Sequence, residues 1–236
     1  MGRQWLQKNK EITANKRAKI TSKLVREITV AAKMGAADPD MNPRLQMAVD
    51  AARKQSVSND VIARAIKKGS GESGDGADYE MILYEGMAPH NVPVLVECMT
   101  ENRNRTGPDV KSLFRGGQFG SKVTFLFDHV GIVEATHTDG TKDAEEAAIE
   151  CGAQDVEALE STPEDHAGGR FLTEIKDLYT VSNELRKAGW NVASAELGYH
   201  PKDPVVLEGE ALAEVEAFLE RLDDHDDVQK LHVALK

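Results

Sequence analysis

The chain has 236 residues, of which 40% are hydrophobic and 29% charged, proportions that are typical of a folded globular protein rather than a disordered or fibrous one. No apolar run approaches the length of about 18 residues that a transmembrane helix needs, and the basic N-terminus is not followed by the apolar segment of a secretion signal. We therefore expect a cytoplasmic protein without a membrane anchor. Cys98 and Cys151 are far apart in the sequence, which favours reduced, packed thiols over a disulfide or a nucleophile.

Charge is divided unevenly along the chain. Residues 1–70 contain 15 Lys and Arg against 6 Asp and Glu, a net charge of +9, whereas residues 71–236 contain 14 against 34, a net charge of −20. Such asymmetry indicates that the basic part meets a polyanion while the acidic part supplies solubility or other contacts. A basic part that docks on the chain's own acidic part is the alternative.

Helical spacing of apolar residues predicts three helices in the first third of the chain. The first covers residues 16–34 and ends at Gly35, the second follows an Asn42 cap, and the third runs from a Ser58 cap to Gly69. The buried stripe of the first helix is predicted to contain Ile20, Leu24, Ile28 and Ala31. These helices predict one small bundle.

A glycine- and serine-rich segment then predicts a linker and a domain boundary. Beyond it, β-branched and aromatic residues predict strands at 79–86, 92–100 and 122–128. Between the last two, "TGPDVKSLFRGG" predicts a helix opened by Thr106, with Asp109 three residues on in a capping-box pattern.

From Gly131 the predicted order is β-α-β-β-α-β, which is the ferredoxin-like pattern. A final helix and strand cannot belong to that unit, so we expect them to complete the earlier half-domain. The predicted fold class is α+β. The predicted domains are a basic helical bundle (1–70), a linker (71–78), a discontinuous α+β domain (79–129 and 204–236) and an inserted ferredoxin-like domain (130–203).

No sequence pattern indicates a reaction. The chain lacks the phosphate-binding, serine-hydrolase and zinc-protease motifs, and its seven histidines show no metal-ligand spacing, so neither catalytic residues nor a metal or other cofactor are predicted. "DDHDDV" at 223–228 lacks the glycine-punctuated loop of a calcium site and is interpreted as a solvated turn. "GGQFG" at 116–120 follows a helix rather than opening one, which indicates a helix stop.

The first helix and the segment before it present a stripe of cations that could follow a phosphate backbone, with an indole available for stacking. This predicted nucleic-acid site consists of Arg3, Trp5, Lys8, Lys10, Lys16, Arg17, Lys19, Lys23, Arg26 and Lys33. A solvated helix face is the alternative. An RNA-recognition sheet is not expected in the ferredoxin-like unit, because its inner strands offer only Phe171 as a stacking ring.

A second candidate anion site lies in "TENRNRT". Arg103 and Arg105 precede a predicted helix, whose positive N-terminal end disfavours cations, so an anion there would be stabilising. Either the neighbouring Glu101 and Asp109 serve this role, or a phosphate binds from outside. The second site therefore consists of Asn102, Arg103, Asn104 and Arg105.

Several blocks of this sequence resemble the YebC/PmpR family over nearly the whole chain. They include "KLVREITVAAKMGAADPDMNPRLQMAVDAAR", "VIARAIKKGSGE", "VPVLVECMTENRNRT" and "LDDHDDVQKLHVAL". The resemblance implies an N-terminal helical bundle with two α+β domains, no catalytic site, and a nucleic-acid role, either as a DNA-binding transcriptional regulator or as a ribosome-associated translation factor. The leader "MGRQWLQKNK" departs from the family pattern, since it lacks the usual histidine and serine.

The favoured hypothesis is a non-enzymatic nucleic-acid-binding regulator of gene expression, with DNA or ribosomal RNA, and possibly the ribosome, as partner. The sequence does not separate these targets and gives no oligomeric state. A small-ligand sensor or interaction scaffold is the alternative of another class, in which Arg103 and Arg105 would hold a carboxylate.

Overall fold

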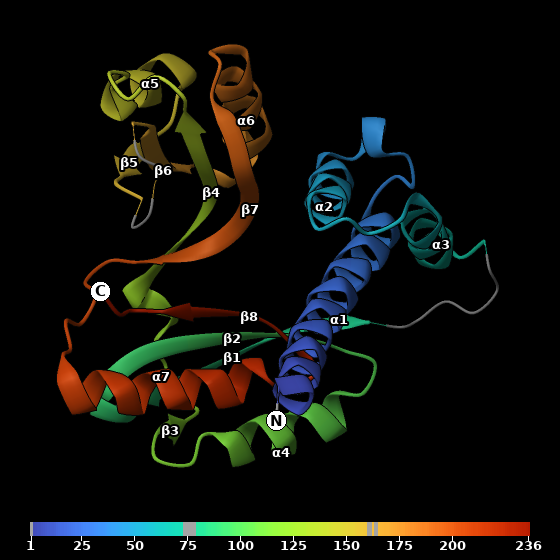
Figure 1. The fold of residues 1–236 in the computed structure, drawn as a ribbon, viewed down its shortest axis with the longest axis vertical. Coiled ribbons are helices and arrows are strands. Elements are labelled where there is room, and N and C mark those ends of the chain that lie inside the picture. Colours follow the sequence, from blue (N-terminus) through green and yellow to red (C-terminus); the bar gives the residue numbers. More distant parts are fainter. Residues whose placement is uncertain (1, 73–78, 160–161, 163–164) are drawn as a thin grey trace. The chain divides into compact units, whose positions relative to one another are not determined.

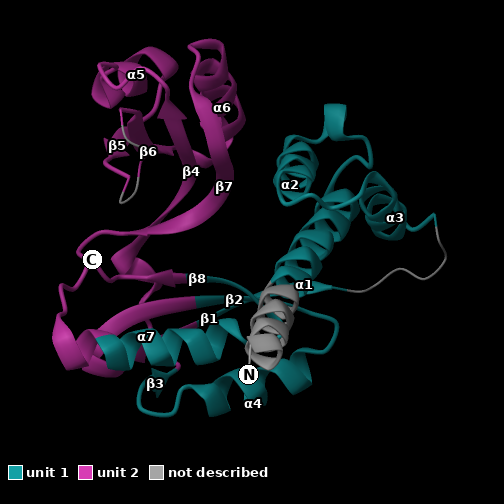
Figure 2. Ribbon diagram, in the orientation of Figure 1, with its two compact units in different colours: residues 1–84, 96–119, 213–231 teal, residues 85–95, 120–212, 232–236 magenta. Residues whose placement is uncertain are grey.

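The computed structural model of the chain describes residues 2–72, 79–159, 162 and 165–236, with side chains from residue 17 onward. It forms two compact units, the first made of residues 1–84, 96–119 and 213–231 and the second of 85–95, 120–212 and 232–236 (Figure 2). Across the described residues, each helix is either too short or too polar to cross a lipid bilayer. The domain boundaries given above stay predictions.

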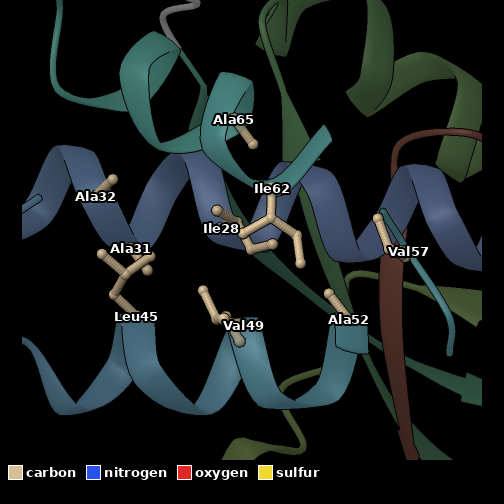
Figure 3. Packing of buried hydrophobic residues seen from close by; sticks show 10 residues of the cluster. Ile28, Ala31, Ala32, Leu45, Val49, Ala52, Val57, Ile62 and Ala65 are labelled. Atoms are coloured by element: carbon tan, nitrogen blue, oxygen red, sulfur yellow. The ribbon is translucent and has the colours of Figure 1, made fainter. Parts of the chain in front are cut away.

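Three helices open the first unit: α1 (Gly2–Met34), α2 (Pro43–Lys54) and α3 (Asn59–Gly69). Their shared core is a layer of buried aliphatic side chains between the C-terminal half of α1 and the two shorter helices (Figure 3), and includes Ile28, Ala31, Leu45, Val49, Ala52 and Ile62. The predicted bundle is therefore confirmed. Ile20 is the exception to the predicted stripe, since it is 45% exposed and lies beyond the reach of that core.

Asn42 connects the first two helices through its side chain. Its Oδ1 accepts from the Leu45 N–H and caps α2, as predicted, while its Nδ2 donates to the carbonyl oxygens of Ala31 and Ala36. One amide group thus closes α2 and ties its start to the end of α1.

Gly69 is the last residue of α3, as predicted, and it also lies close to α1. A Cβ there would lie 2.2 Å from the Thr29 carbonyl oxygen and 2.8 Å from the Ala32 Cβ. A glycine at this position lets α3 approach α1 closely.

The first sheet has the strand order β3-β1-β2-β8 (Figure 1). Its strands are β1 (Glu80–Ala88), β2 (Val92–Thr100), β3 (Gln118–Phe119) and β8 (Val228–Val233), and its helices are α4 (Arg103–Leu113) and α7 (Gly209–Asp223). The last strand of the chain pairs with β2, so the C-terminus completes this sheet as expected. Phe114 and Phe218 pack edge to face, which joins the end of α4 to α7.

Two predicted elements in this region are wrong. Helix α4 begins after Asn102, whose Oδ1 accepts from the Arg105 N–H, and Thr106 lies buried inside the helix rather than at its start. The predicted strand 122–128 is largely replaced by a 3₁₀ helix over Thr124–Leu126, and the N–H groups of Val123 and Thr124 donate to the Glu85 carboxylate instead of to a neighbouring strand.

The second sheet, in the second unit, has the order β5-β6-β4-β7, with β4 antiparallel to both β6 and β7. Its elements in chain order are β4 (Phe127–His137), α5 (Ala144–Cys151), β5 (Asp155–Glu157), β6 (Ala167–Thr173), α6 (Leu178–Lys187) and β7 (Asn191–Pro201). This order and topology confirm the ferredoxin-like unit. Phe171 is fully buried against Trp190, so its ring is closed to a nucleobase.

Short 3₁₀ helices connect several of these elements. They are η1 (Pro39–Met41), η2 (Pro89–Asn91), η3 (Thr124–Leu126) and η4 (Ile175–Asp177). In η2, His90 and Asn91 both have positive φ angles, which reverse the chain between β1 and β2.

Candidate nucleic-acid interface

The predicted cationic stripe lies along α1. Arg17 and Lys33 are exposed, while Lys19, Lys23 and Arg26 are half-buried. The side chains of the remaining predicted residues, Arg3, Trp5, Lys8, Lys10 and Lys16, lie outside the described residues. The stripe that can be assessed therefore consists of five cations on the second half of the helix.

The three central cations of this stripe contact the turn between α7 and β8. The Lys19 Nζ lies 2.6 Å from the Asp224 Oδ1, and the Lys23 Nζ lies 2.6 Å from the Asp223 Oδ1. Arg26 donates to the main-chain carbonyl oxygen of Asp226. The hydrogen bond to Asp224 raises the pKa of Lys19, so this ammonium stays charged throughout the physiological range.

"DDHDDV" is consequently more than the solvated turn that the sequence indicated. We name residues 223–227 the acidic turn. Asp223 and Asp224 remain more than half exposed although each meets a lysine. Beyond the turn, the Gln229 Nε2 donates to the Lys23 carbonyl oxygen over 2.8 Å, which places the start of β8 against the same helix.

Asp227, the last residue of the acidic turn, binds Arg105 of the second predicted anion site. The Arg105 Nη2 lies 3.0 Å from the Asp227 Oδ2, and the same oxygen accepts from the Thr106 hydroxyl over 2.7 Å. Thr100 lies 3.3 Å from this oxygen and 2.8 Å from the Thr106 hydroxyl. Arg105 is therefore paired with an internal carboxylate, but with Asp227 rather than with Glu101 or Asp109.

The other members of the second site lie at the beginning of α4. Asn102 uses its side chain as the helix cap, and Arg103 and Asn104 are exposed in the first turn. Asp109, which was considered as a partner for the arginines, lies 3.8 Å from the His225 Nε2 instead.

A single acidic turn thus brings the two predicted cationic sites together. Asp223 and Asp224 face the lysines of α1, and Asp227 faces Arg105 of α4, all within the first unit. Sequence reasoning missed these three aspartates as partners. The acidic cluster was visible, but about 200 residues separate it from Lys19 and Lys23, and no local pattern reports a contact over that separation.

The described residues were compared with two kinds of catalytic group, a metal centre and a cysteine nucleophile. They contain no cluster of three His, Cys, Asp or Glu side chains that could hold a metal ion. Burial raises the pKa of the Cys98 thiol to about 12, and burial also raises the pKa of Cys151, so neither thiol forms a thiolate nucleophile near neutral pH.

Comparison with known proteins matches nearly the whole chain to one family, in two segments. Residues 2–72 match the TACO1/YebC protein N-terminal domain, and residues 79–235 match the TACO1/YebC second and third domain. The chain belongs to the TACO1/YebC family.

Curated TACO1/YebC relatives carry the name probable transcriptional regulatory protein. One from Pseudomonas fluorescens is 49% identical over 100% of this chain and 99% of its own length, and one from Bdellovibrio bacteriovorus is 44% identical over the whole of both chains. The crystal structure of a conserved hypothetical protein from Aquifex aeolicus matches with a TM-score of 0.81 at 36% identity, covering 93% of this chain and 90% of that one. These names support a regulatory role.

Proposed function

We propose that the protein is a non-enzymatic regulator of gene expression that binds nucleic acid through the cationic stripe on α1. The observation that carries this proposal is the row formed by Lys19, Lys23, Arg26 and Lys33 on α1, which also carries Arg17, in a chain that is otherwise strongly acidic. The names of the relatives favour a regulator. The net charge of −20 on residues 71–236 would repel a phosphate backbone, which favours binding to the basic first 70 residues, where the stripe lies.

The ion pairs with the acidic turn are compatible with this role. Lys19 is 42% exposed and its partner Asp224 is 67% exposed, and an exposed pair of this kind contributes only about 0.2–1 kcal/mol. A polyanion presents many phosphates at once and gains entropy from counterion release. The lysines can therefore exchange a carboxylate for a phosphate at low cost.

Removing the charges of the central stripe tests the proposal. We expect Lys19→Gln/Lys23→Gln/Arg26→Gln to weaken binding of a fluorescent 20-base-pair DNA or a ribosomal RNA fragment by about tenfold to a hundredfold at 50 mM salt. The slope of log Kd against log salt should become shallower by about two to three, because three phosphate contacts are lost. Fluorescence anisotropy over a salt series measures both quantities.

The matched control is Lys142→Gln/Lys176→Gln/Lys187→Gln, which removes the same charge from exposed positions in the second unit. It should change affinity by less than about threefold. Equal losses in the two triple variants would show that only net charge matters, and binding by the wild type that ignores salt would reject the proposed interface.

DNA and RNA are the two possible targets within this proposal. Co-sedimentation of the wild type with ribosomes, lost in the α1 triple variant and kept in the control, would assign RNA. A sequence-specific footprint on promoter DNA, lost in the same variant, would assign DNA.

A further inference from the structure

The acidic turn occupies the same cations that the proposed function assigns to nucleic acid. We propose that this turn is an intramolecular competitor, a carboxylate stand-in for phosphate that covers the centre of the α1 stripe until a nucleic acid displaces it. This inference rests on the proposed function and adds its regulation: the chain sets its own affinity and so discriminates against weak, isolated anions.

The geometry is that of a short anionic strand lying across a helix. Lys19, Lys23 and Arg26 are spaced by four and three residues, so they project from one face of α1. In this order they meet the carboxylates of Asp224 and Asp223 and the carbonyl oxygen of Asp226. Every central cation of the stripe is thereby paired with an oxygen of one five-residue segment.

The turn is anchored at one end and open at the other. Asp227 is only 7% exposed and is held by Arg105 and Thr106, whereas the side chains of Asp223 and Asp224 are 61% and 67% exposed. Rotation of these two side chains would take both carboxylates away from the lysines without moving the backbone of α7 or β8, and would leave only the longer hydrogen bonds that Lys19 and Lys23 donate to main-chain carbonyl oxygens of the turn, at 3.3 and 3.5 Å. The competitor can therefore leave the lysines while the fold around it stays intact.

A purely structural role for the pairs makes a different prediction. Helix α1 is also held by its buried core and by the Gln229 hydrogen bond to the Lys23 carbonyl, so its position does not depend on two exposed ion pairs. If the pairs served only to hold the helix, their removal would lower stability and leave affinity unchanged or weaker. A competitor, in contrast, raises affinity when it is removed.

The test is a double variant, Asp223→Asn/Asp224→Asn, that neutralises the competing carboxylates and keeps their shape. We expect it to bind the same labelled DNA and RNA about threefold to tenfold more tightly than the wild type at 50 mM salt, as measured by anisotropy. The control Glu210→Gln/Glu216→Gln removes two charges from exposed positions on α7 and should tighten binding by less than about twofold. Circular dichroism checks that each variant is folded.

A thermodynamic cycle locates the effect. In the Lys19→Gln/Lys23→Gln background, the two aspartate substitutions should change affinity by less than about twofold, because the competed cations are gone. The single variant Asp224→Asn, expected to tighten binding by about twofold to threefold, supplies the same test should the double variant fail to fold.

The outcomes distinguish a failure of the competitor proposal from a failure of the proposed nucleic-acid binding. Tighter binding in the aspartate variants alone, abolished in the lysine background, supports the competitor. If the aspartate variants bind with the same affinity as the wild type, or if the Glu210→Gln/Glu216→Gln control binds more tightly by the same factor, the competitor is overturned and the proposed function stands. If neither the wild type nor any variant binds DNA or RNA, both proposals are rejected.

Discussion

Asp227 joins the start of the chain's last strand to α4 through hydrogen bonds from Arg105 and Thr106. Burial opposes the ionisation of its carboxyl group, but hydrogen bonds from Thr106 and Arg105 outweigh that effect and leave its pKa below the ordinary value. The ionised form is therefore the one that the fold stabilises. The Met99 N–H also donates to the Asp227 carbonyl oxygen over 2.8 Å, so main chain and side chain act at the same point.

We expect Asp227→Asn to lower the free energy of unfolding by about 1.5–3 kcal/mol at pH 7, because a buried carboxylate that accepts charged and neutral hydrogen bonds is replaced by an amide. Urea denaturation followed by circular dichroism measures the change. Asp226→Asn is the matched control in the same turn, with the same change in charge at an exposed side chain, and should cost less than about 0.5 kcal/mol.

The difference in unfolding free energy between the wild type and Asp227→Asn should also depend on pH. Since the folded pKa of Asp227 lies below the unfolded value of about 3.9, its contribution is fully present above about pH 5 and is lost as the pH falls through the folded pKa. The gap between wild type and Asp227→Asn should therefore narrow below about pH 4. A gap that stays constant down to pH 2 would contradict the assigned role of the ionised carboxylate.

At this scale the sequence predicted the need of Arg105 for an anion but not the identity of that anion. The rule that a helix N-terminus disfavours a cation uses only local information, and it correctly indicated a carboxylate or phosphate. Asp227 is 122 residues away, and the contact exists because β8 pairs with β2. Only the sheet order supplies that information.

Elements were predicted well where the chain carries its own start and stop signals. The strand Val92–Thr100 has the predicted bounds, since a turn precedes it and a polar segment follows it. Helix α4 was placed too late, because Thr106 and Asp109 imitate a capping box while Asn102 is the actual cap. For α4, the competing cap Asn102 decided where the helix begins. For residues 122–128, the Glu85 carboxylate took the hydrogen bonds that a strand would have made.

Asn42 offers the sharpest test of an element boundary. We expect Asn42→Ala to lower the free energy of unfolding by about 2–4 kcal/mol, because it removes the cap of α2 together with two hydrogen bonds to carbonyl oxygens at the end of α1. Urea denaturation monitored by helical circular dichroism measures the loss.

Asp143→Ala is the comparison for Asn42→Ala, since the Asp143 side chain caps α5 with one hydrogen bond to the Glu145 N–H. It should cost about 1 kcal/mol. Similar losses for both substitutions would show that the two hydrogen bonds donated by Asn42 contribute nothing, which would remove its role in joining α1 to α2.

For the whole molecule, the charge division that the sequence displays is partly neutralised inside the first unit. The basic part and the acidic part do meet, as the alternative interpretation proposed, through Lys19, Lys23 and Arg26, while Arg17 and Lys33 are exposed on the same helix. The net charge of residues 71–236, −20, is far larger than these contacts can cancel. A nucleic acid should consequently be repelled from most of the surface and bind in one orientation.

Lysine footprinting tests this orientation directly. We expect a saturating nucleic acid to reduce acetylation of Lys19, Lys23 and Lys33 by about threefold or more, because phosphates cover these amines, as mass spectrometry of the modified protein would measure. Lys142, Lys176 and Lys187 lie in the acidic remainder of the chain and should change by less than about 1.5-fold in the same sample. At high salt the protection should disappear, since the contact is electrostatic. Protection centred on the second group would place the nucleic acid on the ferredoxin-like unit and refute the polarity argument, because the carboxylates around those lysines would then fail to exclude it.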